Sequence, residues 1–191
     1  MANPMKALKH DLRERVLAKR DGLPTSIQDK AKLALTKYVV LFGDVKGKTV
    51  SSFWPIRSEI DPRLLSETLK GLGAELVLPV VVDKTTIEFR RFTDESDLVD
   101  AGFGTKGPSP TATVVDPDIM IVPLSVFDPK CGRIGYGAGY YDRAIASLRA
   151  KGKSPKTYGI AFEEQMVDQV PQDEFDIVLD FVLTPSNVYQ S

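Results

Sequence analysis

The chain has 191 residues, of which 42% are hydrophobic and 27% are charged, and its formal net charge is −1. This composition predicts a globular protein with a substantial core, and it excludes a disordered chain or one whose overall charge attracts nucleic acid. One cysteine and one histidine exclude an internal disulfide framework, a multi-cysteine zinc site and a paired-histidine metal site within one chain.

The first half of the chain is expected to alternate helices with short strands. Apolar residues at every fourth position predict a helix over residues 5–20. Thr25, with Gln28 three residues later, resembles a capping box and predicts a second helix that ends near residue 42. Asp61-Pro62 predicts the start of a third helix, which ends at the glycines that follow. β-rich or apolar runs predict strands over residues 49–53, 75–82 and 86–92.

The second half continues this alternation after a loop. Six glycines and prolines predict that residues 100–117 form this loop. Strands are expected over residues 119–124, 157–162 and 177–183, and a helix over residues 140–151. Helices that alternate with short apolar strands predict an α/β fold with a mainly parallel sheet, and we expect residues 1–191 to form one domain.

The strongest local signal is the segment Arg133-Ile-Gly-Tyr-Gly-Ala-Gly-Tyr-Tyr-Asp142, which lies between a predicted buried strand and a helix. Alternating glycines let backbone N–H groups approach a ligand, and a helix N-terminus favours an anion. The pattern is neither the dinucleotide-binding nor the P-loop motif, and glycines also serve tight turns. Arg133 as a phosphate donor and Asp142 as a magnesium ligand favour a nucleotide site.

A second signal is a basic face on the first predicted helix. At 100° per residue, four cations fall within an arc of about 60°; they are Lys6, Lys9, Arg13 and Arg20. This face could be solvated, or it could bind phosphate or nucleic acid.

A third signal is the segment of residues 53–62, which leaves a predicted strand and enters a helix. In an open α/β sheet, loops at the carboxyl ends of strands bind ligands. Trp54 could simply belong to the core. An aromatic ring near the carboxylate of Glu59 also suits a flat heterocycle with N–H donors.

Together these segments resemble the 5-formyltetrahydrofolate cyclo-ligase family, also called 5,10-methenyltetrahydrofolate synthetases. The matching segments, which cover nearly the whole chain in order, are Lys-x-x-x-Arg at Lys9 and Arg13, Ser-Glu-Ile-Asp at residues 58–61, the glycine segment at residues 133–142, Ala161-Phe162 with Gln165, Val170-Pro171, and Asp176 with Asp180. Two positions depart from the family pattern: Cys131 stands where glycine is frequent, and Ala138 where glycine or lysine is common.

The resemblance implies a three-layer α/β/α fold, shared with sugar-phosphate isomerases and coenzyme A transferases, and an enzyme that uses ATP and Mg²⁺ to cyclise 5-formyltetrahydrofolate. By resemblance, catalysis falls to Lys9, Arg13 and Arg133. The ATP-binding residues would be Lys9, Arg13, Arg133, Ile134, Gly135, Tyr136, Gly137, Ala138, Gly139, Tyr140 and Tyr141. Those facing folate would be Trp54, Glu59, Tyr136, Gly137, Ala138, Gly139 and Tyr140. Asp142 and Asp176 would hold the metal.

Other interpretations remain open at this stage. A non-catalytic module could use the basic helix on RNA, and a sugar-phosphate isomerase could share the fold without using ATP. A thiol nucleophile at Cys131 has only the remote His10 to activate it. No apolar run approaches the ~18 residues of a membrane span and residues 1–20 lack a secretory signal, so we expect a cytoplasmic monomer that binds small molecules and has neither nucleic acid nor membrane as a partner.

Overall fold

Within residues 4–102 and 105–191, which the computed structural model describes, the central element is a seven-stranded sheet with the order β11-β10-β9-β6-β1-β2-β3. The strands are β1 (Thr49–Ser51), β2 (Glu75–Val81), β3 (Ile87–Arg91), β6 (Ile119–Pro123), β9 (Lys156–Ile160), β10 (Phe181–Leu183) and β11 (Val188–Gln190). The five central strands run parallel, and β3 and β11 pair antiparallel at the two edges. The predicted α/β fold with a mainly parallel sheet is confirmed.

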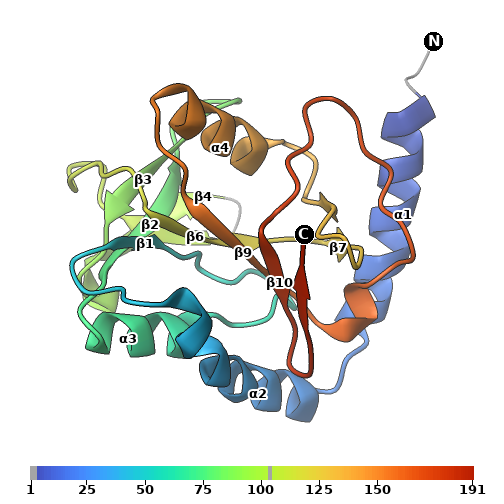
Figure 1. Ribbon diagram of the computed structural model, residues 1–191, viewed down its shortest axis with the longest axis horizontal. Helices are drawn as coiled ribbons and strands as arrows, with labels where there is room; N and C mark the ends of the chain where they lie inside the picture. The colour runs from blue at the N-terminus through green and yellow to red at the C-terminus, as the bar shows by residue number, and fades with distance from the viewer. Residues whose placement is uncertain (1–3, 103–104) are drawn as a thin grey trace.

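Helices cover both faces of this sheet (Figure 1). On one face lie α2 (Thr25–Ala34), the 3-10 helix η1 (Leu35–Phe42) and α3 (Arg63–Gly71), and on the other lies α4 (Tyr140–Ala150). Ile119 and Ile121 of β6 are buried in the cluster on the α2–α3 side, whereas Met120 and Val122 are buried in the cluster on the α4 side. Both sets of β6 side chains are therefore covered, which explains its continuous apolar sequence.

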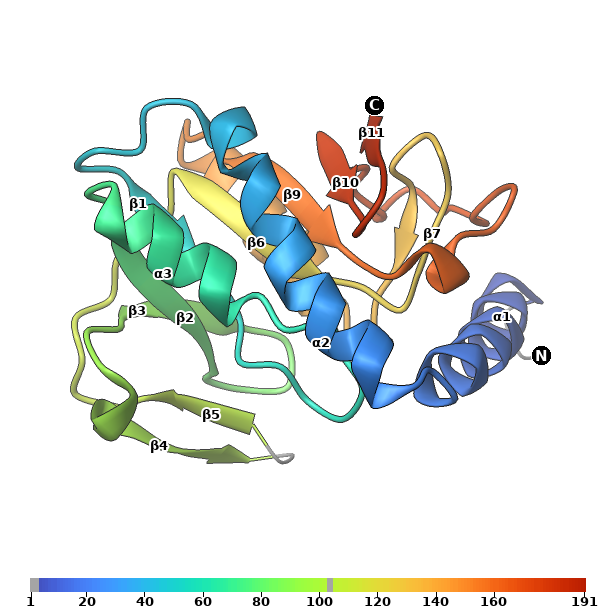
Figure 2. The same cartoon turned by 90° about the horizontal axis from the view of Figure 1, so that it is seen from below.

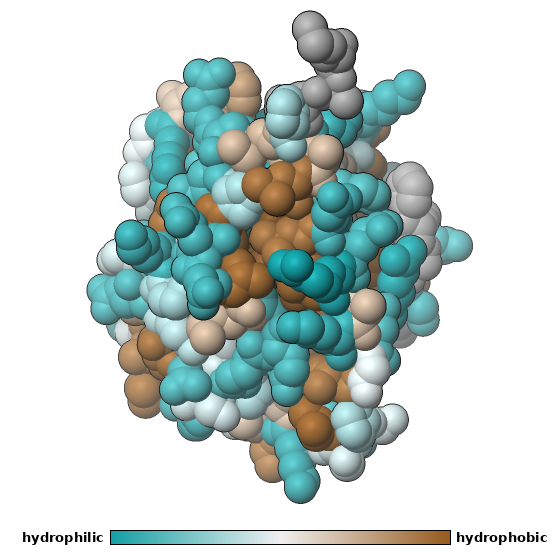
Figure 3. All heavy atoms as spheres, turned by 90° about the vertical axis from the view of Figure 1, so that its right-hand side faces the viewer, coloured by the Kyte–Doolittle hydropathy of each residue, from teal (hydrophilic) through white to brown (hydrophobic). Residues whose placement is uncertain are grey.

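The first helix, α1 (Pro4–Asp21), lies at one end of the sheet. Leu12 and Val16 are buried in a third cluster, which includes residues of the short hairpin β7 (Val126–Phe127) and β8 (Arg133–Ile134). Leu8, the other member of the predicted apolar repeat, is 54% exposed. Figure 3 views the molecule from the side of α1 and shows an apolar area bordered by polar side chains. None of the helices in the described parts of the chain combines the length and the apolarity that a membrane-spanning helix needs.

The second predicted helix changes character part-way along. It begins at Thr25 as expected, but it is α-helical only to Ala34, and a 3-10 helix continues to Phe42. β-branched residues in that second stretch lower its α-helical propensity. The predicted capping box is wrong, because Pro24 occupies the N-cap position and the Gln28 side chain donates to the carbonyl of Leu23.

The prediction that residues 100–117 form only a loop is also wrong. Residues on both sides of 103–104, which lie outside the described residues, form an antiparallel hairpin of β4 (Leu98–Gly102) and β5 (Thr105–Pro108). Figure 2 shows this hairpin apart from the main sheet. A Cβ at Gly107 would lie only 3.2 Å from the Cβ of Ala101 in β4, and it would be in ordinary contact, at 3.6 Å, with the carbonyl oxygen of Pro79 in β2. Glycine here serves strand packing rather than a turn.

The last predicted strand, over residues 177–183, is shorter than expected. Only residues 181–183 join the sheet, as β10. The N–H of Ile177 donates to the Asp142 carboxylate and that of Leu179 to the carbonyl of Cys131. These tertiary hydrogen bonds replace a strand ladder and draw this segment toward the glycine segment.

Candidate active site

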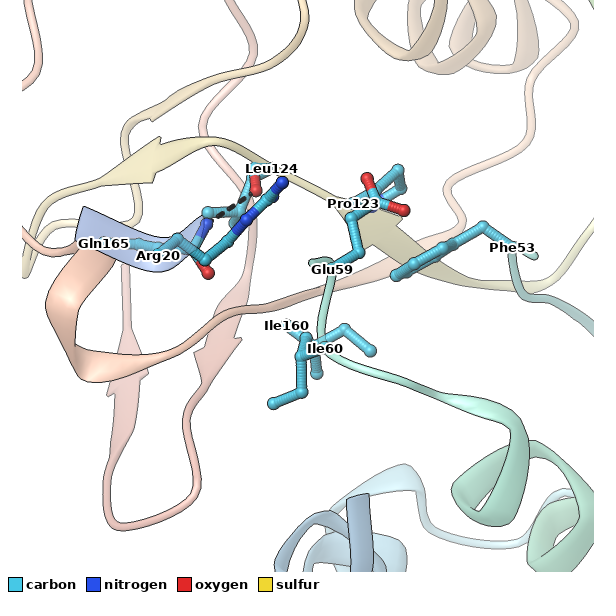
Figure 4. A pocket seen from close by; sticks show the side chains of 8 residues that line it. All are labelled: Arg20, Phe53, Glu59, Ile60, Pro123, Leu124, Ile160 and Gln165. Atoms are coloured by element: carbon cyan, nitrogen blue, oxygen red, sulfur yellow. Dashed lines mark hydrogen bonds between the residues drawn. The ribbon is translucent and has the colours of Figure 1, made fainter. Parts of the chain in front are cut away.

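The strand order places a ligand crevice between β1 and β6. The chain runs from β1 to β2 in one direction along the sheet, and from β6 to β9 and β10 in the other. Such a reversal opens a crevice at the carboxyl ends of the two strands. A small pocket lies there (Figure 4), lined by Arg20, Phe53, Glu59, Ile60, Pro123, Leu124, Ile160 and Gln165. Its side chains leave no room for a molecule the size of water, so a ligand could enter it only if some of them moved.

Glu59 supplies the carboxylate of this pocket. The loop after β1 folds back so that the backbone N–H of Ile56 donates to Glu59 Oε2 at 2.9 Å. Burial raises the pKa of Glu59 above its usual value, although the hydrogen bonds from Ile56 and Tyr136 and the charges of Arg20 and Arg57 oppose that rise. A desolvated carboxylate is a strong acceptor for N–H groups of a bound ligand.

Arg20 is the second ionic side chain of the pocket and is only 1% exposed. Its Nε donates to Ser58 Oγ at 2.9 Å, and its Nη1 donates to the Tyr136 hydroxyl at 3.0 Å. Figure 4 shows the Arg20 and Glu59 side chains both reaching toward the segment of Pro123 and Leu124. Sequence reasoning placed Arg20 on the basic face but missed it as a site residue. Its position four residues after the apolar Val16 was the available signal that it points inward.

The glycine segment connects β8 to α4 and lies against α1. Arg13 Nε donates to the carbonyl of Gly135 at 2.7 Å. Gly137 has a φ of +104°, and a Cβ there would lie 3.4 Å from the Arg13 guanidinium. Gly139, in the left-handed conformation, is the N-cap residue of α4. The basic face is therefore not simply solvated, because Arg13 is hydrogen-bonded to the backbone of the glycine segment. Lys6, on the same face, remains exposed.

One ion pair joins the two ends of this segment, and Lys9 forms two more with a later part of the chain. Arg133, whose side chain is 4% exposed, donates from Nη2 to Asp142 Oδ1 at 2.9 Å. Asp142 also accepts a hydrogen bond from the backbone N–H of Ile177 at 3.0 Å. Ile177 directly follows Asp176 in the sequence. Lys9 of α1 pairs with Asp176 and with Asp173. Burial opposes ionisation of Lys9, but its hydrogen bonds to these aspartates outweigh burial and raise its pKa.

The geometry thus collects most of the predicted phosphate and metal residues in one place. Asp142 has no side-chain capping bond to α4, and it pairs with an arginine instead. Within residues 4–102 and 105–191 no group of three or more His, Cys, Asp or Glu side chains could hold a metal by itself. Asp142 is bound to the backbone next to Asp176, and one or two carboxylates suit Mg²⁺ when phosphate oxygens and water complete the shell, so these residue types fit a magnesium ion that arrives with a nucleotide.

Comparison with known proteins assigns the family. The sequence model of the 5-formyltetrahydrofolate cyclo-ligase family matches residues 5–185. The chain belongs to this family. The 5-formyltetrahydrofolate cyclo-ligase of Escherichia coli K12 is 30% identical over 173 residues, which are 87% of this chain and 94% of the relative. That of Mycolicibacterium smegmatis is 27% identical and covers 93% of each chain. The NMR structure of Aquifex aeolicus 5,10-methenyltetrahydrofolate synthetase superposes with a TM-score of 0.78 at 28% identity, covering 96% of this chain and 92% of that one.

Trp54 lies apart from Glu59 in this cyclo-ligase family member. The Arg63 guanidinium stands 4.9 Å from the centre of the Trp54 ring, and both line a second hollow between β1, β2 and α3. Phe53 lines this hollow and the Glu59 pocket. Trp54 and Glu59, two of the residues predicted to face folate, therefore border hollows that share Phe53.

Cys131, the first departure from the family pattern noted in the sequence, adopts a backbone conformation that glycine favours. Its φ of +63° falls in the left-handed region, which glycine adopts without strain. The side chain is fully buried, and burial raises the pKa of the thiol to about 11. A protonated and inaccessible thiol is not a nucleophile, which agrees with the sequence-based argument against that role.

Proposed function

We propose that this chain catalyses the ATP-dependent cyclisation of 5-formyltetrahydrofolate to 5,10-methenyltetrahydrofolate, with release of ADP and phosphate. Family membership over nearly the whole chain supports the reaction. The observation that carries it is the adjacency of two sites, since Tyr136 of the glycine segment contacts Arg20 in the Glu59 pocket. Phosphoryl transfer between two bound substrates needs a nucleotide site and an acceptor site side by side.

The chemistry needs little covalent help from the protein. The formyl oxygen is a poor leaving group until it is phosphorylated. The γ-phosphoryl group of ATP is transferred to this oxygen, and ADP is released. The nitrogen at position 10 then attacks the activated carbon, and the C–O bond breaks to release phosphate. The protein must align the two substrates and neutralise the charge on the transferring group. This explains how one histidine and one buried cysteine can suffice.

We assign the phosphate contacts to Lys9, Arg13 and the backbone of residues 135–139, with Tyr140 and Tyr141 at the start of α4. Arg133 is buried and paired, so we assign it to holding Asp142 and the segment in place. Glu59 would accept N–H bonds from the pterin ring, and Trp54 would border the adjoining hollow. When bound with nucleotide at Asp142 and Asp176, Mg²⁺ would neutralise phosphate charge.

One absorbance assay tests the function. Methenyltetrahydrofolate absorbs in the near ultraviolet, and we expect it to form from 5-formyltetrahydrofolate only when Mg-ATP is present. Product without ATP, or no product with it, would overturn the proposal. The inward position of Lys9, Arg13 and Arg20 removes most of the basic face that an RNA-binding module would present.

Removing either α1 cation that reaches the phosphate cluster should raise the KM for ATP. We expect Lys9→Met and Arg13→Leu each to raise it by about 10-fold or more, the effect of losing one charge-assisted hydrogen bond. Lys6→Met, which removes an exposed charge from the same helix, is the matched control and should match wild type. A folded Lys9 or Arg13 variant with unchanged KM for ATP would exclude that residue from the clamp.

Removing a proposed magnesium ligand should raise the Mg²⁺ concentration needed for half-maximal rate. Titrating Mg²⁺ at fixed ATP should show this shift, with a lower maximal rate, in Asp142→Asn and in Asp176→Asn. Asp173→Asn is the control, because Asp173 pairs with Lys9 as Asp176 does but is not a proposed ligand. An equal shift in Asp173→Asn and Asp176→Asn would mean that the effect passes through Lys9 rather than through the metal.

A further inference from the structure

Arg20 is a buried cation whose hydrogen bonds go to neutral partners. Its guanidinium donates to the hydroxyls of Ser58 and Tyr136. The carboxylate that pairs with it, on the 56%-exposed side chain of Asp21, is 3.7 Å away. Burying a charge is costly unless other charges compensate it. Ser58 in turn donates to the Asp21 carboxylate, and the carboxylate that shares the pocket with Arg20 is Glu59.

We propose that Arg20 is a positioning residue of the reaction, which holds the Glu59 loop against the glycine segment so that Glu59 faces the folate. This proposal rests on the proposed function, because it takes Glu59 as the folate acceptor. Arg20 donates to Ser58, which directly precedes Glu59 in the sequence. It also donates to Tyr136, which stands between two glycines of the glycine segment.

The position of Arg20 on α1 strengthens this assignment. Arg13 and Arg20 are seven residues apart, so they lie on the same face of the helix about two turns from one another. Arg13 holds the carbonyl of Gly135, and Arg20 holds the side chain of the next residue, Tyr136. One rigid helix thus fixes consecutive residues of the nucleotide segment, and its far end also fixes the folate loop.

The charges around Glu59 give the proposal a pH signature. The side chains that act on its ionisation are Arg20 from α1, Arg57 from its own loop and Tyr136 from the glycine segment, and the charge of Glu59 in turn helps to raise the pKa of Tyr141 in α4. Burial raises the pKa of Glu59, and the charge of Arg20 opposes that rise. Removing Arg20 would therefore raise the pKa of Glu59 further. On acidification, folate binding would weaken at a higher pH than in wild type.

The test compares Arg20→Met, Arg20→Lys and Tyr136→Phe with wild type. For each, KM values for 5-formyltetrahydrofolate and ATP are measured across the pH range in which the protein stays folded. We expect Arg20→Met to raise the folate KM about 10-fold or more, to raise the ATP KM less, and to move the acidic rise in folate KM to higher pH. Arg20→Lys should restore the pH profile but not the KM, because an ammonium cannot reproduce the two-sided contact of the guanidinium.

Matched variants separate a positioning role from a structural one. Lys19→Met removes an exposed charge one residue away and should match wild type. Arg20→Met and Tyr136→Phe should be partly non-additive when combined, since both remove the Arg20–Tyr136 hydrogen bond, while Tyr136→Phe also removes the hydrogen bond to Glu59. If Arg20→Met does not fold, Arg20→Lys and Tyr136→Phe carry the test: a wild-type folate KM in both would overturn the proposal.

Two further outcomes would also overturn it: a folded Arg20→Met with wild-type folate KM and pH profile, or equal increases in both KM values. Failure of the proposed function is a separate result, because wild-type protein would then form no methenyltetrahydrofolate before any variant is compared.

Discussion

Replacing Arg133 by methionine should lower the free energy of unfolding by about 3–5 kcal/mol, the usual cost of breaking a buried ion pair from one side. The Arg133 side chain is 4% exposed and its guanidinium donates to both oxygens of Asp142. Without it, Asp142 keeps its hydrogen bond from Ile177 but loses its charge partner in a mostly dry site. Urea-induced unfolding of the ligand-free protein measures the change.

Two companion variants show whether the buried pair is the cause. Arg91 pairs with Glu75 at 2.8 Å, nearly the same N–O distance as in the Arg133–Asp142 pair, but the Arg91 side chain is 47% exposed. Arg91→Met should therefore cost no more than about 1 kcal/mol. The double variant Arg133→Met/Asp142→Leu should be more stable than Arg133→Met, since it leaves no unpaired charge. Equal losses in the Arg133 and Arg91 variants would contradict this account.

Glu59→Gln should weaken binding of 5-formyltetrahydrofolate by about 10- to 150-fold and change ATP binding much less. A lost hydrogen bond to a charged group costs about 1.5–3 kcal/mol, which corresponds to that range. Glutamine keeps the length of the side chain and can still accept from Ile56, so the loop should hold its shape. Calorimetric titration with each substrate separately measures both affinities, with Glu164→Gln as an exposed control. Equal losses for both substrates would contradict the folate role.

The same substitution separates binding from stability. The pKa of Glu59 is raised in the folded chain, so its proton is held more tightly in the folded than in the unfolded state. Its contribution to stability is present below the unfolded pKa and is lost as the pH rises through the folded pKa. Glu59→Gln removes this loss, so its melting temperature at neutral pH should not fall below that of wild type. Wild-type folate binding should also weaken as the pH falls toward the pKa of Glu59, whereas binding by Glu59→Gln should not.

Much of the sheet could be predicted from local pattern. The apolar run of β6 and the helix signals at Asp61-Pro62 and residues 140–151 correspond to real elements. The errors came from tertiary contacts. Glycine and proline predicted a loop at residues 100–117, but Gly107 packs against β2 within a hairpin. No local signal showed that β5 has a neighbouring strand to lie against.

Motifs in the sequence could select candidate site residues, but they could not predict the contacts among them. Motifs selected Lys9, Arg13, the glycine segment, Asp142 and Asp176, and the structure brings them together. The inward direction of Arg20 and the pairing of Arg133 with Asp142 depend on how α1 docks on the hairpin of β7 and β8. That docking uses a few buried residues from distant parts of the chain, and sequence periodicity describes only one helix at a time.

The docking of α1 also sets when the site can form during synthesis. Lys9 and Asp176 are 167 residues apart in the chain, and Arg13 and Gly135 are 122 residues apart. The ribosome therefore releases α1 long before its partners exist, and contacts between such distant residues carry a large loop-closure cost. Strands β1, β2 and β6 can pair earlier, because they come from residues 49–123. A nascent or truncated chain that ends before residue 133 could build the middle of the sheet and would still lack every contact that fixes the nucleotide segment. The contacts of α1 with this part of the chain are thus complete only after Asp176 has been synthesised.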